Sequence, residues 1–218
     1  MKVLNLYACL GGNRYKWNEV CPDIEVTAVE LDPELARMYQ ERFPNDKVIV
    51  ADAHQYLLDH YREFDFIWSS PPCPSHSRIR ITQKTRSEFR AVYPDFKLYE
   101  EIVFLDNYFE GKYCVENVIP YYEPLIPAQK RGRHLYWCNF LLPSSINERK
   151  LEGVLCTMRN EHNVLMKFHD ININVKSNAG GYREVLRNLV DYEAGRTIFE
   201  TALGIIRQSD QSQLSLFV

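Results

Sequence analysis

The sequence predicts an α/β fold with a mostly parallel central sheet flanked by helices, and two observations point to it. In the first half of the chain, short apolar runs alternate with amphipathic stretches, which is typical of strands and helices that follow one another. Glycine and acidic residues stand directly after several apolar runs, where an open α/β sheet binds its ligands. With 218 residues, the chain is expected to form one domain over residues 1–207.

The expected elements alternate along the chain. Strands are expected at residues 2–8, 25–30, 47–51, 64–69, 113–116 and 133–140. Helices are expected at residues 33–42, 54–61, 96–109 and 182–206. Asp32 suits the N-cap of the first helix because its side chain can accept from free backbone N–H groups, and Pro33 suits the first helical position. No periodicity predicts a regular element between residues 141 and 180.

Composition excludes several classes of protein. Hydrophobic residues at 45% and charged residues at 25% are ordinary values for a globular chain, so neither disorder nor a fibrous fold is indicated. No apolar run has the length of a membrane helix, and the N-terminus turns polar too soon for a signal peptide, so a cytoplasmic location is expected. The six cysteines lack Cys-x-x-Cys spacing and a histidine at ligand spacing, so no metal site or disulfide framework is predicted.

Three expected strand ends carry residues suited to a nucleoside cofactor. The residues expected to line this pocket are Tyr7, Ala8, Leu10, Gly11, Gly12, Glu30, Leu31, Asp52 and Ala53. The adjacent glycines allow a sharp turn, Glu30 lies about 20 positions further on, where a carboxylate can accept both ribose hydroxyls, and Asp52 can accept from the adenine amine. The phosphate-cradling Gly-x-Gly-x-x-Gly spacing is missing, which favours a cofactor with a ribose and no phosphate. The set predicts an S-adenosylmethionine pocket.

The residues after the fourth expected strand suit chemistry on a pyrimidine ring. Cys73 stands between Pro72 and Pro74, on a stiff turn that suits a reactive thiolate. Attack of a thiolate at carbon 6 of cytosine would make carbon 5 nucleophilic enough to take a methyl group. Glu116, after the fifth strand, would donate a hydrogen bond or a proton to ring nitrogen 3. Arg131 or Arg133 would hold the carbonyl oxygen of the base.

These motifs, in this order, resemble those of the DNA cytosine carbon-5 methyltransferases. The matching segments are Pro72-Cys73 with Ser77, Glu116-Asn117-Val118, Gln129-Lys130-Arg131-Gly132-Arg133 and residues 181–190. The resemblance covers most of residues 1–206. It implies a Rossmann-like S-adenosylmethionine-dependent methyltransferase fold, a covalent Cys73 adduct, and a cofactor pocket to which Pro72 and Asn188 also contribute.

The sequence departs from the family at several positions. Tyr7 stands where Phe is usual, Pro74 follows the nucleophile where Gln is usual, and Arg187 replaces a glycine beside Asn188. The large target-recognition region of the family is reduced here to about residues 141–180. Specificity is therefore expected to be short, relaxed or supplied by a partner, and the size suggests a solitary or phage-type member that acts as a monomer.

A duplex DNA substrate would have to present its cytosine flipped out of the stack. The net charge is −3, but basic residues are concentrated just after Cys73, where a loop could close over the phosphate backbone. The residues expected to contact DNA are Ser77, Arg78, Arg80, Lys84 and Arg86, within a basic loop that extends to Arg90.

The last residues, 208–218, are expected to form a flexible tail. Within it, Gln213, Leu214, Leu216 and Phe217 resemble the short peptide by which bacterial proteins dock on the replication sliding clamp. Such a tether would raise the effective concentration of the enzyme at new DNA.

Three other functions stay open from the sequence. Ser70-Pro71-Pro72 resembles part of the motif of exocyclic-amine methyltransferases, although that chemistry needs no thiol and uses an aromatic residue at position 73. A transfer RNA could replace DNA as the substrate of cytosine-5 chemistry. A non-catalytic module that binds nucleic acid is disfavoured, because it would not need Cys73, Glu116 and Arg133 together.

Overall fold

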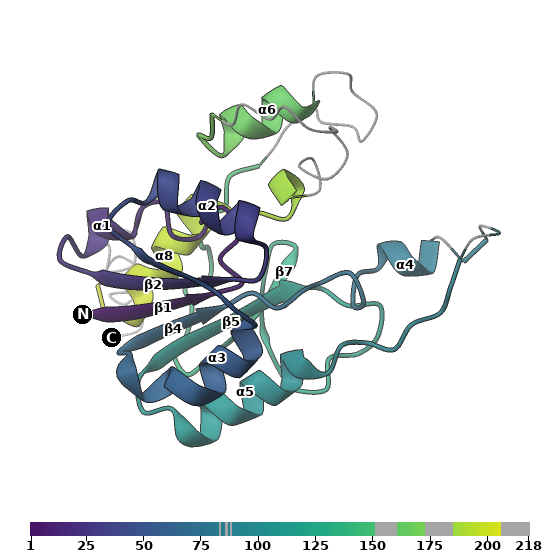
Figure 1. Ribbon diagram of the computed structural model, residues 1–218. Helices are drawn as coiled ribbons and strands as arrows, with labels where there is room; N and C mark the ends of the chain where they lie inside the picture. Colours follow the sequence, from purple (N-terminus) through teal and green to yellow (C-terminus); the bar gives the residue numbers. More distant parts are fainter. Residues whose placement is uncertain (83, 86, 88, 151–160, 173–184, 206–218) are drawn as a thin grey trace, which may run out of the picture.

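The computed structural model describes residues 1–82, 84–85, 87, 89–150, 161–172 and 185–205 (Figure 1). The strands are β1 (Lys2–Leu6), β2 (Glu25–Glu30), β3 (Lys47–Val50), β4 (Phe66–Ser69), β5 (Lys112–Val118), β6 (Gln129–Arg131) and β7 (His134–Cys138). The helices are α1 (Trp17–Val20), α2 (Pro33–Arg42), α3 (Ala53–His60), the 3₁₀ helix η1 (Tyr61–Glu63), α4 (Ile79–Thr82), α5 (Lys97–Tyr108), α6 (Glu161–Phe168) and α8 (Tyr192–Ala202).

The strands form one sheet with the order β3-β2-β1-β4-β5-β7-β6. All neighbours from β3 to β5 are parallel, whereas β7 runs antiparallel to both β5 and β6. The strand order reverses between β1 and β4, and in open α/β sheets the crevice at such a reversal receives the ligand. The predicted mostly parallel sheet is confirmed, and its topology places a ligand site between the loops that follow β1 and β4.

Apolar side chains cover both faces of the sheet. Leu4, Leu6 and Ile67 belong to the apolar cluster that includes side chains of α3 and α5, whereas Val3 and Phe66 belong to the cluster that includes side chains of α1 and α8. The two pairs of helices lie on opposite faces of the sheet (Figure 1). This alternation follows the two-residue repeat of a strand, and both faces are apolar because helices bury both. The sheet is therefore a rigid central layer from which the strand-end loops project.

Most predicted elements are confirmed, including the helix at 33–42, which Asp32 caps by accepting from the N–H groups of Glu34 and Leu35. The single helix expected at 182–206 is wrong. Residues 182–184 lie outside the described residues, and a new helix, α8, begins after Asp191, whose side chain accepts from the N–H groups of Glu193 and Ala194. A local cap thus overrides the apolar periodicity.

Several short elements were not predicted, and one strand begins later than expected. The unpredicted elements are α1, α4, α6 and β6. Arg133 does not begin the last long strand but lies with Gly132 in the two-residue turn that joins β6 to β7. Gly132 has a φ of +53°, which favours glycine, and this backbone requirement sets the end of the hairpin.

Candidate active site

The loop after β1 has an unusual backbone and is tightly packed. Tyr7, Cys9 and Gly11 have φ values of 55°, 48° and 67°, in the left-handed region. A Cβ at Gly11 would lie 2.4 Å from the Phe43 ring, and one at Gly12 would lie 2.5 Å from the carbonyl oxygen of Val190. Both glycines are therefore required by packing. Non-glycine residues in this region cost about 1–3 kcal/mol each and cluster at ligand sites.

Glu30 joins the loop after β1 to the loop after β2. Its carboxylate accepts hydrogen bonds from the backbone N–H of Cys9 at 2.8 Å and of Asp32 at 3.0 Å. Leu31, which follows Glu30 directly after β2, is 68% exposed. A fixed carboxylate beside an exposed apolar side chain suits a nucleoside, which offers hydroxyl donors and an apolar ring face.

Asp52 occupies the corresponding position after β3. It caps α3 by accepting from the N–H groups of His54 and Gln55, at 2.9 and 3.2 Å, and its other oxygen lies 3.5 Å from Lys97 Nζ. The Gln55 N–H and Lys97 lower the pKa of Asp52, so the group is ionised at neutral pH. The structure thus places Glu30, Leu31, Asp52 and Ala53 at neighbouring strand ends, as the sequence predicted.

A buried carboxylate, Glu101 of α5, ties three of these loops together and was not predicted. It accepts from the Tyr7 hydroxyl at 2.5 Å and from the Ser69 hydroxyl at 2.6 Å, and His54 Nδ1 lies 3.1 Å away. Burial and the charge of Glu101 raise the pKa of Tyr7, so this phenol remains a donor. The signal in the sequence is a glutamate beside Ile102 on the apolar face of α5.

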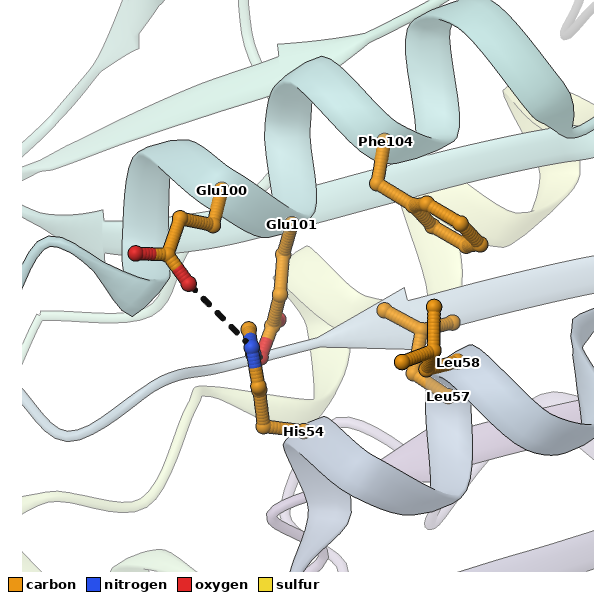
Figure 2. Close-up of a pocket in the computed structure, with 6 residues that line it drawn as sticks. All are labelled: His54, Leu57, Leu58, Glu100, Glu101 and Phe104. Atoms are coloured by element: carbon orange, nitrogen blue, oxygen red, sulfur yellow. Dashed lines mark hydrogen bonds and ion pairs between the residues drawn. The ribbon is translucent and has the colours of Figure 1, made fainter.

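A hollow of about 210 Å³ lies beside this network, between α3 and α5. Figure 2 shows His54 pointing toward Glu100 and Glu101, with the apolar wall formed by Leu57, Leu58 and Phe104. His54 Nε2 lies 3.3 Å from Glu100. The lining includes none of the residues predicted to bind the cofactor or to react, so the hollow is separate from the candidate site.

The Cys73 turn is held by its own backbone hydrogen bonds and by one side chain of β5. Asn117 donates from Nδ2 to the carbonyl oxygen of Pro71 at 2.9 Å, and the N–H groups of His76 and Ser77 donate to the carbonyl oxygen of Cys73, both at 3.0 Å. Cys73 itself is half-buried. Asn117 was matched to a motif but given no role, although an asparagine directly after the glutamate was visible in the sequence.

Glu116 faces Cys73 from the end of β5. Burial raises the pKa of the Cys73 thiol, and the nearby negative charge of Glu116 raises it further. Glu116 is itself only 6% exposed. The thiol is therefore mainly protonated in the resting protein, and it must lose its proton before it can act as a nucleophile.

Two further side chains, not predicted, complete the surroundings of Glu116. His134 Nε2 lies 3.6 Å from Glu116 Oε1, and His134 Nδ1 lies 3.5 Å from Glu148 Oε1. Burial of the imidazole opposes its protonation, but the charges of Glu116 and Glu148 outweigh it and raise the pKa of His134. The contact with His134 lowers the pKa of Glu148. His134 therefore lies between two carboxyl groups, those of Glu116 and Glu148.

The two predicted arginines lie in different surroundings. Arg131 donates to the carbonyl oxygens of Pro143 and Leu142, at 2.5 and 2.8 Å, so its guanidinium anchors the segment after β7. Arg133, at the exposed turn, makes no side-chain hydrogen bond or ion pair with any of the described residues. Its charge nevertheless acts on both His134 and Glu148. Arg133 is the freer of the two to meet a substrate.

The basic loop after Cys73 projects from the body of the domain, with α4 well away from the sheet (Figure 1). Arg78 donates to the carbonyl oxygen of Pro120 at 3.3 Å, and Arg80 to that of Arg90 at 2.9 Å. Ser77 bridges to Pro120, and Lys84 lies in a turn. Arg86 lies outside the described residues. The loop also exposes apolar side chains, including Ile79 and Tyr93, the latter 92% exposed.

The segment that includes Asn188 packs on the glycine loop. Leu186 and Leu189 form an apolar cluster with Leu10 and Leu165, and Asn188 follows a helical turn, donating its N–H to the carbonyl oxygen of Val185. The structure thus brings this segment to the loop after β1, while the tail residues Gln213, Leu214, Leu216 and Phe217 lie outside the described residues.

No helix in the described part of the chain is long and apolar enough to cross a membrane. The same residues contain no cluster of three or more His, Cys, Asp and Glu side chains that could hold a metal ion.

Comparison with known structures identifies the fold. A methyltransferase from Entamoeba histolytica, EhMeth, superposes with a TM-score of 0.54 over 95% of this chain and 99% of its own, at 11% identity. A Spodoptera frugiperda DNMT2 mutant matches at 26% identity over 54% of this chain and 35% of its own, with a TM-score of 0.39. A protein described as a DNA modification methyltransferase encoded within an E. coli prophage matches at 18% identity over 56% and 33%, with a TM-score of 0.38.

The chain thus spans about a third of the length of the insect protein. No curated protein sequence matches it. The predicted fold, that of an S-adenosylmethionine-dependent methyltransferase, is confirmed. Residues 1–102, which include the glycine loop, Glu30, Asp52 and Cys73, match the family model of the C-5 cytosine-specific DNA methylases.

Proposed function

We propose that the protein transfers a methyl group from S-adenosylmethionine to carbon 5 of cytosine in DNA, through a covalent bond to Cys73. The observation that carries the proposal is the pairing of Cys73 with Glu116. Cys73 lies on the turn after β4, Glu116 lies on the neighbouring parallel strand β5, and Glu116 is close enough to influence the pKa of the thiol. A nucleophile beside a buried carboxyl group is what addition to a pyrimidine ring requires.

The hydrogen-bond acceptors at the strand ends suit this cofactor. Glu30 would accept from the ribose hydroxyls, Asp52 from the adenine amine, and the exposed Leu31 would cover one face of the ring. The loop from Tyr7 to Gly12, with Ala53, Pro72 and Asn188, would line the rest of the pocket. When bound, S-adenosylmethionine supplies an electrophilic methyl group on its sulfonium sulfur.

Cys73 begins the chemistry once its thiol has lost its proton. Its Sγ bonds to carbon 6 of the base, and the electron pair of the ring moves toward carbon 5 and nitrogen 3. Asn117 holds this turn in place through the carbonyl of Pro71, so Sγ approaches the ring from a fixed direction. After methylation, loss of the proton on carbon 5 and departure of the Cys73 thiolate restore the aromatic ring.

Glu116 and Arg133 stabilise the charge that develops on the base. Glu116 donates a proton to nitrogen 3, which neutralises the ring as the thiolate adds. Arg133, with no hydrogen-bond partner among the described residues, donates to the carbonyl oxygen. Arg131 supports the hairpin that carries Arg133, since its guanidinium is occupied by the carbonyls of Pro143 and Leu142.

DNA is the proposed substrate, with the cytosine flipped into the pocket. The basic loop would hold the distorted strand through Ser77, Arg78, Arg80, Lys84 and Arg86, and its exposed apolar side chains suit contact with unstacked bases. Because residues 141–150 and 161–172 add only α6 and short connections, we propose that this reduced segment confers relaxed specificity.

The tail is proposed to bind the bacterial sliding clamp through Gln213, Leu214, Leu216 and Phe217. Binding of the full chain to purified clamp, compared with a chain lacking residues 213–218, tests this directly. Unchanged binding to the clamp after deletion of residues 213–218 would contradict this proposal.

The proposed reaction is tested by its product. The protein is incubated with S-adenosylmethionine and either duplex DNA or transfer RNA, the nucleic acid is digested to nucleosides, and the methylated bases are separated by chromatography. 5-Methylcytosine from DNA is expected. N4-methylcytosine or N6-methyladenine would contradict carbon-5 chemistry, and product from RNA alone would contradict the DNA substrate.

A further inference from the structure

His134 contacts both Glu116, whose charge acts on Cys73, and Glu148, so that three titratable groups are connected. The imidazole stands between Glu116 and Glu148, with Nε2 to Oε1 and Nδ1 to Oε1 distances of 3.6 and 3.5 Å. The side chains of His134, Glu116 and Glu148 are 18%, 8% and 20% exposed, respectively. Burial of a carboxylate without a partner is costly, and His134 supplies Glu116 with a partner.

The hairpin geometry builds this row. In the β5–β7 register, Glu116 lies opposite Tyr136 and Val118 opposite His134, so Glu116 and His134 are diagonal neighbours on one face of the sheet. Gly132 leaves space for Glu148, because a Cβ at that position would lie 2.1 Å from Glu148 Oε2. The turn that carries Arg133 thus also admits the carboxylate that holds the imidazole.

Charged and titratable groups face His134 from several elements. They are Glu116 of β5, Glu148 after β7, Arg133 of the turn, Tyr136 of β7, with ring centroids 6.3 Å apart, and Arg131 opposite on β6. Arg131 is directed to the carbonyls of Pro143 and Leu142. The charges of the two carboxylates raise the pKa of the imidazole against the opposing effects of its burial and of Arg133.

We propose that His134 is the proton store for Glu116, holding the proton that Glu116 passes to the base and taking it back at the end of the reaction. The inference rests on the proposed function. It gives Glu116, whose charge acts on the half-buried thiol of Cys73, a source of protons within the protein. His134 acts through Glu116 and is therefore a positioning residue, not one that touches the substrate.

The proton balance closes over the cycle. The thiol proton of Cys73 passes to solvent before the attack and returns to Sγ from solvent after the thiolate departs. As Sγ bonds to carbon 6, nitrogen 3 takes a proton from Glu116, and Glu116 takes one from His134 Nε2, which leaves a neutral imidazole. When the carbon-5 proton has passed to solvent and the carbon–sulfur bond breaks, the proton on nitrogen 3 returns through Glu116 to His134. Glu148 stays ionised throughout, which favours return of the proton.

The test compares His134→Gln with the wild-type protein. Glutamine can bridge both carboxylates by hydrogen bonds but cannot store a proton. In single-turnover assays with saturating S-adenosylmethionine, the variant should be at least about tenfold slower. The wild-type rate should rise with pH as the Cys73 thiol ionises and fall again as His134 loses its proton, whereas the variant should keep only the rising limb.

His60→Gln is the matched control, because His60, at the end of α3, forms an exposed pair with Glu63 of η1 at 2.7 Å. It should change neither rate nor pH profile. In a Glu116→Gln background, His134→Gln should slow the reaction less than about twofold further, since both act at one step. A full additional tenfold loss, or an unchanged falling limb in His134→Gln, would overturn the inference.

A second readout does not depend on activity. The titration of the His134 imidazole, followed by NMR, should shift to lower pH in Glu148→Gln and in Glu116→Gln, because each loses a negative neighbour. An unchanged titration overturns the inference whatever the activity. Absence of 5-methylcytosine with an active cofactor-binding protein would instead count against the proposed function, and the inference would fall with it.

Discussion

The candidate site has two halves: a cofactor half, which contains Glu30 and Asp52, and a chemical half, which contains Cys73 and Glu116. The carboxylates of the two halves are held in different ways. On the cofactor half, Glu30 and Asp52 each accept hydrogen bonds from two backbone N–H groups, which fixes the loops. On the chemical half, Glu116 has an ion pair with His134 and no hydrogen bond from the described residues. The contacts of the cofactor half suit binding of a ligand by fixed groups. In the chemical half, the carboxyl group of Glu116 keeps its hydrogen-bonding capacity for a substrate.

The largest difference between the two halves is expected when the proposed nucleophile, Cys73, is removed. Cys73→Ala should abolish methyl transfer, because no other group in the site can bond to carbon 6, while the affinity for S-adenosylmethionine should change less than about twofold since the cofactor half is untouched. Activity is measured with radiolabelled cofactor, and affinity by calorimetry. Cys21→Ala is the control, since Cys21 is another free thiol, after α1. Transfer by Cys73→Ala would contradict the assignment.

The opposite effect is expected on the cofactor half. Glu30→Gln replaces two acceptor oxygens by one, so the N–H of Cys9 or of Asp32 loses its partner. A lost hydrogen bond to a charged group costs about 1.5–3 kcal/mol, so the dissociation constant for S-adenosylmethionine should rise roughly 10- to 150-fold. The rate at saturating cofactor should stay within a few-fold of wild type. A large fall in that rate with unchanged affinity would show that the two halves do not divide in this way.

A smaller effect is expected from the contact that holds the Cys73 turn. Asn117→Asp removes the donor to the buried carbonyl of Pro71 and should slow single-turnover transfer about 5- to 150-fold, as a lost buried hydrogen bond costs about 1–3 kcal/mol. Cofactor affinity should not change. Asn107→Asp removes a similar amide-to-carbonyl bond on the exposed face of α5 and is the control. Equal effects at both positions would argue against a role in positioning.

The smallest effect concerns stability and pH. Glu148, whose pKa is lowered, contributes stability that is present above its unfolded pKa of about 4.3 and is lost as pH falls through its folded value. His134, whose pKa is raised, contributes stability below about pH 6.5 that is lost as pH rises through its folded value. In urea titrations, the advantage of wild type over His134→Gln should therefore be larger at pH 6 than at pH 9. An equal advantage at both would contradict the charged pair.

The same division explains what the sequence could predict. The cofactor half depends on contacts close in sequence, such as the caps by Asp32 and Asp52 and the adjacent glycines, and its strands and loops were predicted within a few residues. The chemical half depends on contacts distant in sequence. The bond from Asn117 to Pro71 and the row from Glu116 to Glu148 exist only once β5, β6 and β7 are paired.

The two arginines show which features of the site the sequence could not predict. Arg131 and Arg133 are equivalent candidates in the sequence, yet the two-residue turn at Gly132 leaves Arg133 exposed while Arg131 meets the carbonyls of the following segment. His134 was overlooked because it reads as an ordinary strand residue, and its charge partner Glu148 lies in a segment without periodicity. Pairing register, not residue type, assigns these side chains to the site.

The central claim is that Cys73 bonds to carbon 6 of the cytosine. It is tested most directly by incubating the protein with S-adenosylmethionine and DNA that contains 5-fluorocytosine, and then separating the products on a denaturing gel. Fluorine cannot leave carbon 5 as a cation, so wild type should be trapped as a covalent complex with DNA, and Cys73→Ala should not. Methylation of ordinary DNA by the wild-type protein without any trapped complex would contradict the account.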